Sequence, residues 1–235
     1  MENILLKYVS PMRACMPSFT LMIVSLLIVF FSCAPAQSSS FQSASAPNEE
    51  MYLIYVHGRI IENKGPNAVS DTFGRYEFYE IKEKLQSKGH LVTADIRRPG
   101  TLEYVDVIVS KVSDLLSNGV SPDKITIVGF SKGGYMALRA AAKLQNPDIN
   151  YVILAGCIHG VVSGDDRSAD GAKGRFLSMV DASDDLGFSC RKFFNRNPQI
   201  TERADIIFKT GEAHGLFYKA NPMWINPVLE WSSRD

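Results

Sequence analysis

One serine of the chain lies in a pattern that favours nucleophilic chemistry. Ser131 is the centre of Gly129-Phe-Ser-Lys-Gly133, between a β-branched apolar run over 125–128 and an Ala-rich run over 135–142. These runs predict a buried strand followed by a helix. A serine on so sharp a turn needs small residues two places before and after it, because larger side chains would collide. The pattern predicts a serine hydroxyl raised above a sheet edge, beside amides that can stabilise an oxyanion. The alternative is a glycine-rich turn that carries a surface serine.

This stretch resembles the nucleophile turn of the α/β-hydrolase superfamily. Gly-Phe-Ser-Lys-Gly-Gly over 129–134 is similar to the small, capless dienelactone-hydrolase, carboxylesterase and acyl-protein-thioesterase branches. The resemblance extends from about Met51 to the C-terminus. It implies an α/β-hydrolase fold, with a doubly wound, mostly parallel sheet of about six strands, helices on both faces and no cap domain. It implies the type of reaction better than the substrate.

The resemblance also implies a catalytic base. In the superfamily this histidine follows the last strand, usually with a glycine after it. His214 follows the predicted strand 206–209 and precedes Gly215. His159 comes too early in the chain for this role.

The catalytic acid of the superfamily commonly falls three residues after the residue that ends the preceding strand. That strand is predicted over 175–180 and runs into Asp181, which stands where the superfamily often has the glycine of G-x-x-D, so Asp184 aligns with the acid. Asp181 and Asp185 are close rivals, and a loop of solvated carboxylates is the alternative to all three. The implied chain order is Ser131, Asp184, His214, which is the α/β-hydrolase order.

The predicted strand 52–56 leads directly into His57-Gly58. In the superfamily this is the strand before the oxyanion loop. Gly58 would let the backbone approach the substrate carbonyl, and the amide of Arg59 would be one oxyanion donor. The amide of Lys132 would be the other. The resemblance implies that His57 is structural and not the base.

Together these residues predict acyl transfer. A serine hydroxyl is a weak nucleophile at neutral pH and needs an adjacent base. His214 would accept the proton of Ser131 and pass it to the leaving group, and Asp184 would hold the imidazole. A small-molecule carboxylic ester or thioester would be cleaved through an acyl-enzyme, with no metal or organic cofactor. A non-catalytic binding protein of the same fold, or a serine peptidase or amidase, remains an alternative.

The remaining elements must place this chemistry on one sheet edge. Helices and strands alternate along the chain, as a parallel sheet requires. Arg97 and Arg98 follow one strand and either line a ligand crevice or form a solvated turn with ion pairs. The other predictions are a loop over 62–72, a helix over 73–87, a strand over 91–96, a helix over 105–116, a strand over 151–155 and a closing helical segment over 217–231 that Pro222 and Pro227 break in two.

The connection after Cys157 bears on both access and stability. Residues 161–173 are rich in Gly, Asp and Ser, and predict a surface loop that is too short and polar for a helical lid. An open site favours short acyl chains, about acetyl to hexanoyl, since each buried methylene adds only about 0.8 kcal/mol. Cys157 and Cys190 follow successive strands, so a disulfide between them is predicted, with separate thiols as the alternative.

The N-terminal region predicts export. Lys7 and Arg13 precede an apolar run over 21–31, which is shorter than the roughly 20 residues of a membrane span. A basic segment followed by a short apolar one is typical of a secretory signal. Phe-Ser-Cys33 resembles a bacterial lipoprotein cleavage site, which would lipidate Cys33, and Ala-Pro-Ala over 34–36 suits ordinary signal peptidase. We favour the lipoprotein.

The chain of 235 residues thus divides into a signal peptide over 1–33, a flexible Ser- and Ala-rich linker over 34–50, and a catalytic domain over 51–235. We expect a periplasmic or outer-membrane-tethered lipoprotein, or a secreted protein. The formal net charge is zero, so nothing in the charge balance indicates a nucleic-acid partner.

Overall fold

The computed structural model describes residues 50–98, 103–200 and 202–233. The predicted signal segment, Cys33 and nearly all of the predicted linker lie outside the described residues. Within the part of the chain that the structure describes, no helix is both long enough and apolar enough to cross a membrane.

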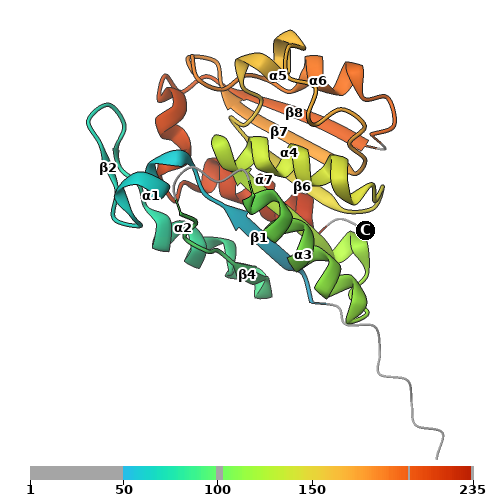
Figure 1. The fold of residues 1–235 in the computed structure, drawn as a ribbon. Helices are drawn as coiled ribbons and strands as arrows, with labels where there is room; N and C mark the ends of the chain where they lie inside the picture. Colours follow the sequence, from blue (N-terminus) through green and yellow to red (C-terminus); the bar gives the residue numbers. More distant parts are fainter. Residues whose placement is uncertain (1–49, 99–102, 201, 234–235) are drawn as a thin grey trace, which may run out of the picture. The chain divides into compact units, whose positions relative to one another are not determined.

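A sheet of six parallel strands forms the centre of the fold, in the order β4-β1-β5-β6-β7-β8 (Figure 1). All neighbouring pairs in it are parallel, so each strand is followed by a crossover connection. The predicted fold class is confirmed. The strands are β1 (Tyr52–Val56), β4 (Leu91–Thr93), β5 (Ile125–Phe130), β6 (Asn150–Leu154), β7 (Arg175–Asp181) and β8 (Glu202–Phe208).

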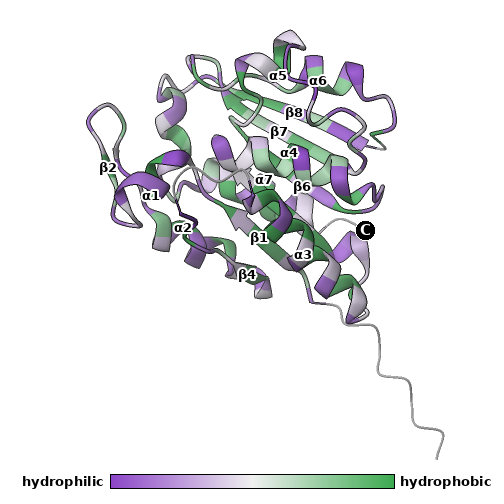
Figure 2. Ribbon diagram, viewed as in Figure 1, coloured by the Kyte–Doolittle hydropathy of each residue, from purple (hydrophilic) through white to green (hydrophobic). Residues whose placement is uncertain are grey.

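Helices cover both faces of this sheet because alternate strand residues face opposite ways. Along β5, Ile125 and Ile127 pack into one core, and Val128 and Phe130 pack into the other. Both inner strands β5 and β6 are buried throughout, and hydrophobic residues follow the strands in Figure 2. One face carries α3 (Tyr104–Ser117), α4 (Lys132–Leu144), α5 (His159–Ser163) and α6 (Arg191–Arg196), and the other carries α1 (Arg59–Lys64), α2 (Phe78–Leu85) and α7 (Pro222–Ser232).

The segment before α2 differs from its prediction. The helix expected over 73–87 begins only at Phe78, and a small antiparallel hairpin of β2 (Val69–Ser70) and β3 (Gly74–Arg75) precedes it. The Ser70 hydroxyl accepts hydrogen bonds from the amides of Thr72 and Phe73 at 3.3 and 3.2 Å. These bonds stabilise a turn at this point in place of the first residues of the expected helix. The loop expected over 62–72 likewise contains the end of α1.

Two other connections also differ. The first three residues of the loop expected over 161–173 belong instead to the short helix α5, and the described connection between β6 and β7 contains no inserted cap domain. The two prolines do not divide α7. Pro222 occupies its first turn, where a missing N–H costs nothing, and Pro227 lies inside the helix. Buried packing of Trp224 and Val228 against the sheet holds α7 together.

Candidate active site

The turn between β5 and α4 has the strained shape expected for a nucleophile. Ser131 has φ 53° and ψ −119°, a backbone conformation that L-residues rarely adopt. Its amide donates to the Leu154 carbonyl at 2.8 Å, which fixes the turn to β6. A Cβ at Gly129 would lie 2.4 Å from the Gly133 carbonyl oxygen, and one at Gly133 would lie 1.9 Å from that of Val56. Glycine is therefore required at both positions.

The expected base and acid are in direct contact. His214 lies in the short helix η3 (Ala213–Tyr218) after β8, and its Nδ1 is 2.7 Å from Oδ2 of Asp184. Both side chains are buried. Oδ1 of Asp184 accepts the amides of Leu186 and Gly187 at 2.9 and 3.1 Å. The carboxylate is thus held in one orientation and leaves Nε2 of the imidazole for another partner.

Asp181, one of the rival acids, has a different place. It ends β7 and accepts four hydrogen bonds, from the amide and hydroxyl of Ser183 and from the amide and hydroxyl of Thr210. Burial by itself raises the pKa of the Asp181 carboxyl, but these hydrogen bonds outweigh burial and hold the pKa below its usual value. Asp181 therefore joins the two loops that carry Asp184 and His214, without contacting the imidazole.

The two amides expected to bind an oxyanion belong to the first residues of two helices. Arg59 is the first residue of α1, after Gly58, and Lys132 is the first residue of α4, after Ser131. Amides in the first turn of a helix have no partner within the helix. A Cβ at Gly58 would lie 3.0 Å from the ring of Phe130, so a larger residue would have to displace this ring slightly where the loop approaches the turn at Ser131.

His57 is fully buried and engaged at both ring nitrogens. Its Nε2 accepts the Arg97 amide at 3.1 Å, so Nδ1 carries the proton and donates to the Gly58 carbonyl at 2.8 Å. Burial first, and then the charge of Arg97, lower the pKa of His57 to about 4. The ring is therefore neutral at physiological pH and has no free nitrogen with which to accept the proton of Ser131.

Comparison with known proteins found similar structures but no similar sequence. The sequence matches no protein-family model and no curated protein. An esterase from Pyrobaculum calidifontis has a similar structure, with a TM-score of 0.55 over 80% of this chain and 77% of its own, at 12% identity. The Arabidopsis thaliana protein SOBER1 gives 0.51 over 79% and 98%, at 12% identity. Est1E from Butyrivibrio proteoclasticus, bound to ferulic acid, gives 0.50 over 79% and 88%, at 14% identity.

The chain has the α/β-hydrolase fold. In this fold Ser131, Asp184 and His214 come from the ends of β5, β7 and β8, which lie at the same edge of the parallel sheet. Ser131 and His214 also line the same cavity.

That cavity has a volume of about 950 Å³. Its lining includes an exposed Leu186 and an exposed Asp185, the second rival acid, whereas the carboxylate that contacts the imidazole is that of Asp184. The α5 end of the connection that we expected to stay on the surface contributes to the wall. Apart from the residues already placed on it, the apolar and aromatic lining consists of Ile60, Phe130, Tyr135, Ile158, Phe188 and Tyr218.

Two aromatic rings lie beside the imidazole of His214. The ring centroids of His214 and Phe130 are 4.7 Å apart. The ring centroid of Phe73, in the β2–β3 turn, lies 6.0 Å from that of His214. We did not predict a role for Phe73, because its sequence position suggested the start of a helix. Only the tertiary placement of the hairpin brings it to the imidazole of His214.

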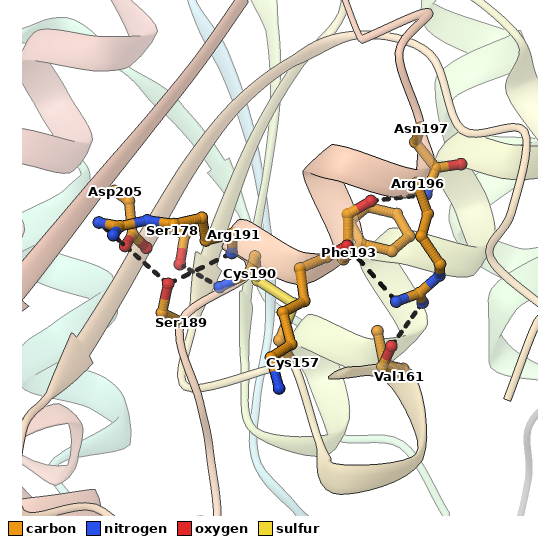
Figure 3. Close-up of a disulfide and its surroundings, with 11 residues drawn as sticks. Cys157, Val161, Ser178, Ser189, Cys190, Arg191, Phe193, Arg196, Asn197 and Asp205 are labelled. Atoms are coloured by element: carbon orange, nitrogen blue, oxygen red, sulfur yellow. Dashed lines mark hydrogen bonds and ion pairs between the residues drawn. A yellow bond between two sulfur atoms is a disulfide. The ribbon is translucent and has the colours of Figure 1, made fainter. Parts of the chain in front are cut away.

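The predicted disulfide between Cys157 and Cys190 is present, with the Cα atoms 5.3 Å apart (Figure 3). The Phe188 amide donates to the Cys157 carbonyl at 3.0 Å, and the Cys190 amide donates to the Ser178 hydroxyl at 3.1 Å. The crosslink therefore joins the two loops that form one wall of the cavity, 158–160 and 185–188.

Arg97 does not lie in a solvated turn. Its side chain is buried against that of Glu62, which also contacts Lys132. Neither contact is visible in the sequence, because Glu62 falls in a stretch that we predicted as a polar loop. Among the described residues, no cluster of three or more His, Cys, Asp or Glu side chains is arranged to hold a metal ion.

Proposed function

We propose that this protein is a serine hydrolase that cleaves carboxylic esters or thioesters of small substrates through an acyl-enzyme. The observation that carries the proposal is the 2.7 Å contact between Asp184 and His214, in a site whose strained turn holds Ser131. The fold supports it, since the compared structures include an esterase and a protein with ferulic acid bound.

The proposed reaction has two halves. In the first, His214 Nε2 takes the proton of Ser131 while Oγ bonds to the ester carbonyl carbon, and the carbonyl electrons move onto oxygen. The amides of Arg59 and Lys132 donate to that oxyanion. Its collapse expels the alcohol or thiol, which receives the proton from His214. In the second half, water repeats the attack on the acyl-enzyme and releases the acid.

Asp184 has an electrostatic task in this scheme. Its Oδ2 accepts from Nδ1, which keeps Nε2 unprotonated before attack and stabilises the imidazolium afterwards. Because Oδ1 is held by two amides, the carboxylate cannot rotate away. The apolar lining of the cavity favours the acyl or aromatic part of a substrate over a highly charged one.

The test uses the serine and the base. Ser131→Ala and His214→Ala should each lower kcat for p-nitrophenyl butyrate by about 10⁴–10⁶-fold, with the circular dichroism spectrum unchanged. A fluorophosphonate should label the wild type at Ser131, as peptide mass spectrometry can verify. Wild-type turnover in Ser131→Ala would refute the mechanism. Absence of labelling and turnover would favour a binding protein, and faster cleavage of matched anilides than of esters would favour an amidase or peptidase.

We also propose that the protein is exported, with Cys33 as the lipidated first residue after cleavage. The buried disulfide supports an oxidising compartment, since cytosolic disulfides are rare. Intact-mass analysis of the protein from membranes should find cleavage before Cys33 and a diacylglyceryl adduct. Cys33→Ser should release the protein from the membrane fraction, and an N-terminus at 37 without lipid would establish ordinary secretion instead.

A further inference from the structure

A cluster of two buried charges and one partly buried charge lies next to the proposed oxyanion hole. Oε1 of Glu62 contacts Nε of Arg97, and Oε2 of Glu62 is 2.6 Å from Nζ of Lys132. The side chains of Glu62 and Arg97 are each 1% exposed, and that of Lys132 is 18% exposed. Two cations flank one carboxylate, so the cluster carries a net positive charge.

Stability alone does not account for this cluster. Buried ion pairs recover their desolvation cost only with good geometry and further hydrogen bonds, and apolar residues of similar size often serve as well. Here Nη1 and Nη2 of Arg97 are buried and have no hydrogen-bond partner within the described residues. Burial lowers the pKa of the Arg97 guanidinium, which the Glu62 carboxylate opposes. Because the desolvation of these charges costs folding free energy, we look for a functional role of the cluster.

Each member of the cluster is attached to one part of the oxyanion hole. Glu62 lies on α1, one turn after Arg59, whose amide is the first proposed donor. Lys132 carries the second donor on its own backbone, directly after Ser131. The bond between Glu62 and Lys132 therefore crosslinks the two elements that carry the donors.

Arg97 connects Glu62 to the loop that carries the first donor. Its side chain holds Glu62, and its amide donates to Nε2 of His57, whose Nδ1 holds the carbonyl of Gly58. Gly58 is the residue before the first donor. A continuous chain of polar contacts thus runs from the oxyanion loop, through the segment that follows β4, to the start of α4.

We propose that Glu62 is the positioning residue of the oxyanion hole: its carboxylate, held by Arg97 and bound to Lys132, sets the spacing between the amides of Arg59 and Lys132. This inference rests on the proposed serine-hydrolase function. The two amides act only when Ser131 Oγ bonds to the carbonyl carbon and the π electrons move to oxygen. Glu62 lines the cavity with a side chain that is only 1% exposed, and in this role it acts on the oxyanion through the backbones that it joins.

The expected effect is on kcat and not on KM, because the oxyanion exists only near the transition state. Loss of one oxyanion donor costs about 10²–10³-fold in kcat. Displacing a donor should cost less than removing it, so we expect Glu62→Gln to lower kcat by about 10–100-fold. KM for p-nitrophenyl butyrate should stay within about twofold.

Glu62→Gln separates positioning from charge. It removes the negative charge of the cluster and leaves both cations, which by Coulomb's law favours an oxyanion. A fall in kcat therefore indicates lost positioning, and a rise in kcat would overturn the proposal. Lys132→Met cuts the same crosslink from the other side and retains the backbone donor. Its effect should not add to that of Glu62→Gln, since both remove one contact.

A transition-state analogue supplies the decisive readout. A trifluoromethyl ketone adds to the serine as a hemiketal whose oxyanion occupies the hole, so its Ki in Glu62→Gln should rise by the same factor as kcat/KM falls. Wild-type kcat and Ki in Glu62→Gln would overturn the proposal.

Two controls keep the test valid where folding suffers. Glu62→Met with Arg97→Met removes the pair without leaving a lone buried charge, and should show the same fall in kcat and the same rise in Ki. Val112→Ala, in the α3 core away from the site, should lower the unfolding midpoint with kcat intact. If Val112→Ala lost kcat in proportion to its stability, the Glu62 effect would be a stability effect. If Ser131→Ala stayed active in this assay, the proposed function itself would fail, which is a separate outcome.

Discussion

Substitution of the two buried aspartates should separate a catalytic acid from a structural one. In Asp184→Asn, the amides of Leu186 and Gly187 still require an acceptor, so the new carbonyl oxygen stays with them. The new NH₂ group then faces Nδ1 of His214 and donates to it. This forces the proton onto Nε2, which can no longer accept the proton of Ser131. We expect kcat to fall by about 10⁴-fold, or about 5.4 kcal/mol of activation free energy.

Asp181→Asn should act on stability instead. Its two oxygens each accept one amide and one hydroxyl, and an NH₂ group in place of either oxygen leaves a partly buried amide of Ser183 or Thr210 without this acceptor. One unsatisfied buried donor costs about 1–3 kcal/mol. We expect the free energy of unfolding to fall by that amount, while kcat falls by less than about 100-fold.

The assay measures kcat for p-nitrophenyl butyrate and the urea midpoint on the same preparations. Asp185→Asn is the matched control, since its carboxylate is exposed at the cavity and should change neither quantity by more than about twofold. A larger loss of kcat in Asp181→Asn or Asp185→Asn than in Asp184→Asn would refute this assignment of the acid.

Three further predictions follow from features outside the proposed catalytic residues. His57 has a pKa of about 4 in the fold and about 6.5 when unfolded, so the imidazole is neutral in both states above pH 6.5, where its full contribution to the free energy of unfolding is present. Between pH 6.5 and 4 only the unfolded state gains the proton, so the free energy of unfolding should fall by up to about 1.4 kcal/mol per pH unit. Urea titrations of His57→Gln should lack this slope. Cys157→Ala with Cys190→Ala should lower the free energy of unfolding by about 2–5 kcal/mol. It should also raise KM more than it lowers kcat, because the loop of Phe188, which lines the cavity, loses its crosslink. An unchanged KM would show that this part of the cavity lining keeps its position without the disulfide. Across p-nitrophenyl esters, kcat/KM should peak between about acetyl and hexanoyl, since each methylene adds at most about 0.8 kcal/mol and the cavity is open to solvent; a rise that continues to dodecanoyl would reveal an acyl tunnel.

The parts of the fold that the sequence predicts are those that local rules determine. The nucleophile turn needs glycines at 129 and 133 for steric reasons that hold in any such turn, and the runs on either side are a plain strand and a plain helix. The position of His214 required the resemblance to a known family, because nothing in the local sequence distinguishes it from another loop histidine.

Other parts depend on contacts between distant segments. Phe73 reads as the first residue of a helix, and only a turn closed by Ser70 brings it to the base. Glu62 reads as a polar loop residue, and only burial against Arg97 shows its place. The choice among the three aspartates also needed the structure, since a shift of one to three residues along a loop changes which carboxylate reaches the imidazole.

The strand order has a consequence for how the site is assembled. β1 is the first strand of the sheet to be synthesised, yet it pairs with β4 and β5, which come much later in the chain. Until they arrive, an apolar strand with unpaired N–H and C=O groups is open to association with other chains. Gly58 follows β1 and Ser131 follows β5, so the two halves of the site meet only when this distant pairing forms. Distant pairings form slowly, whereas the contacts between α3 and α4 are closer in sequence. Hydrolytic activity should therefore return late in refolding, after most of the helical signal has recovered.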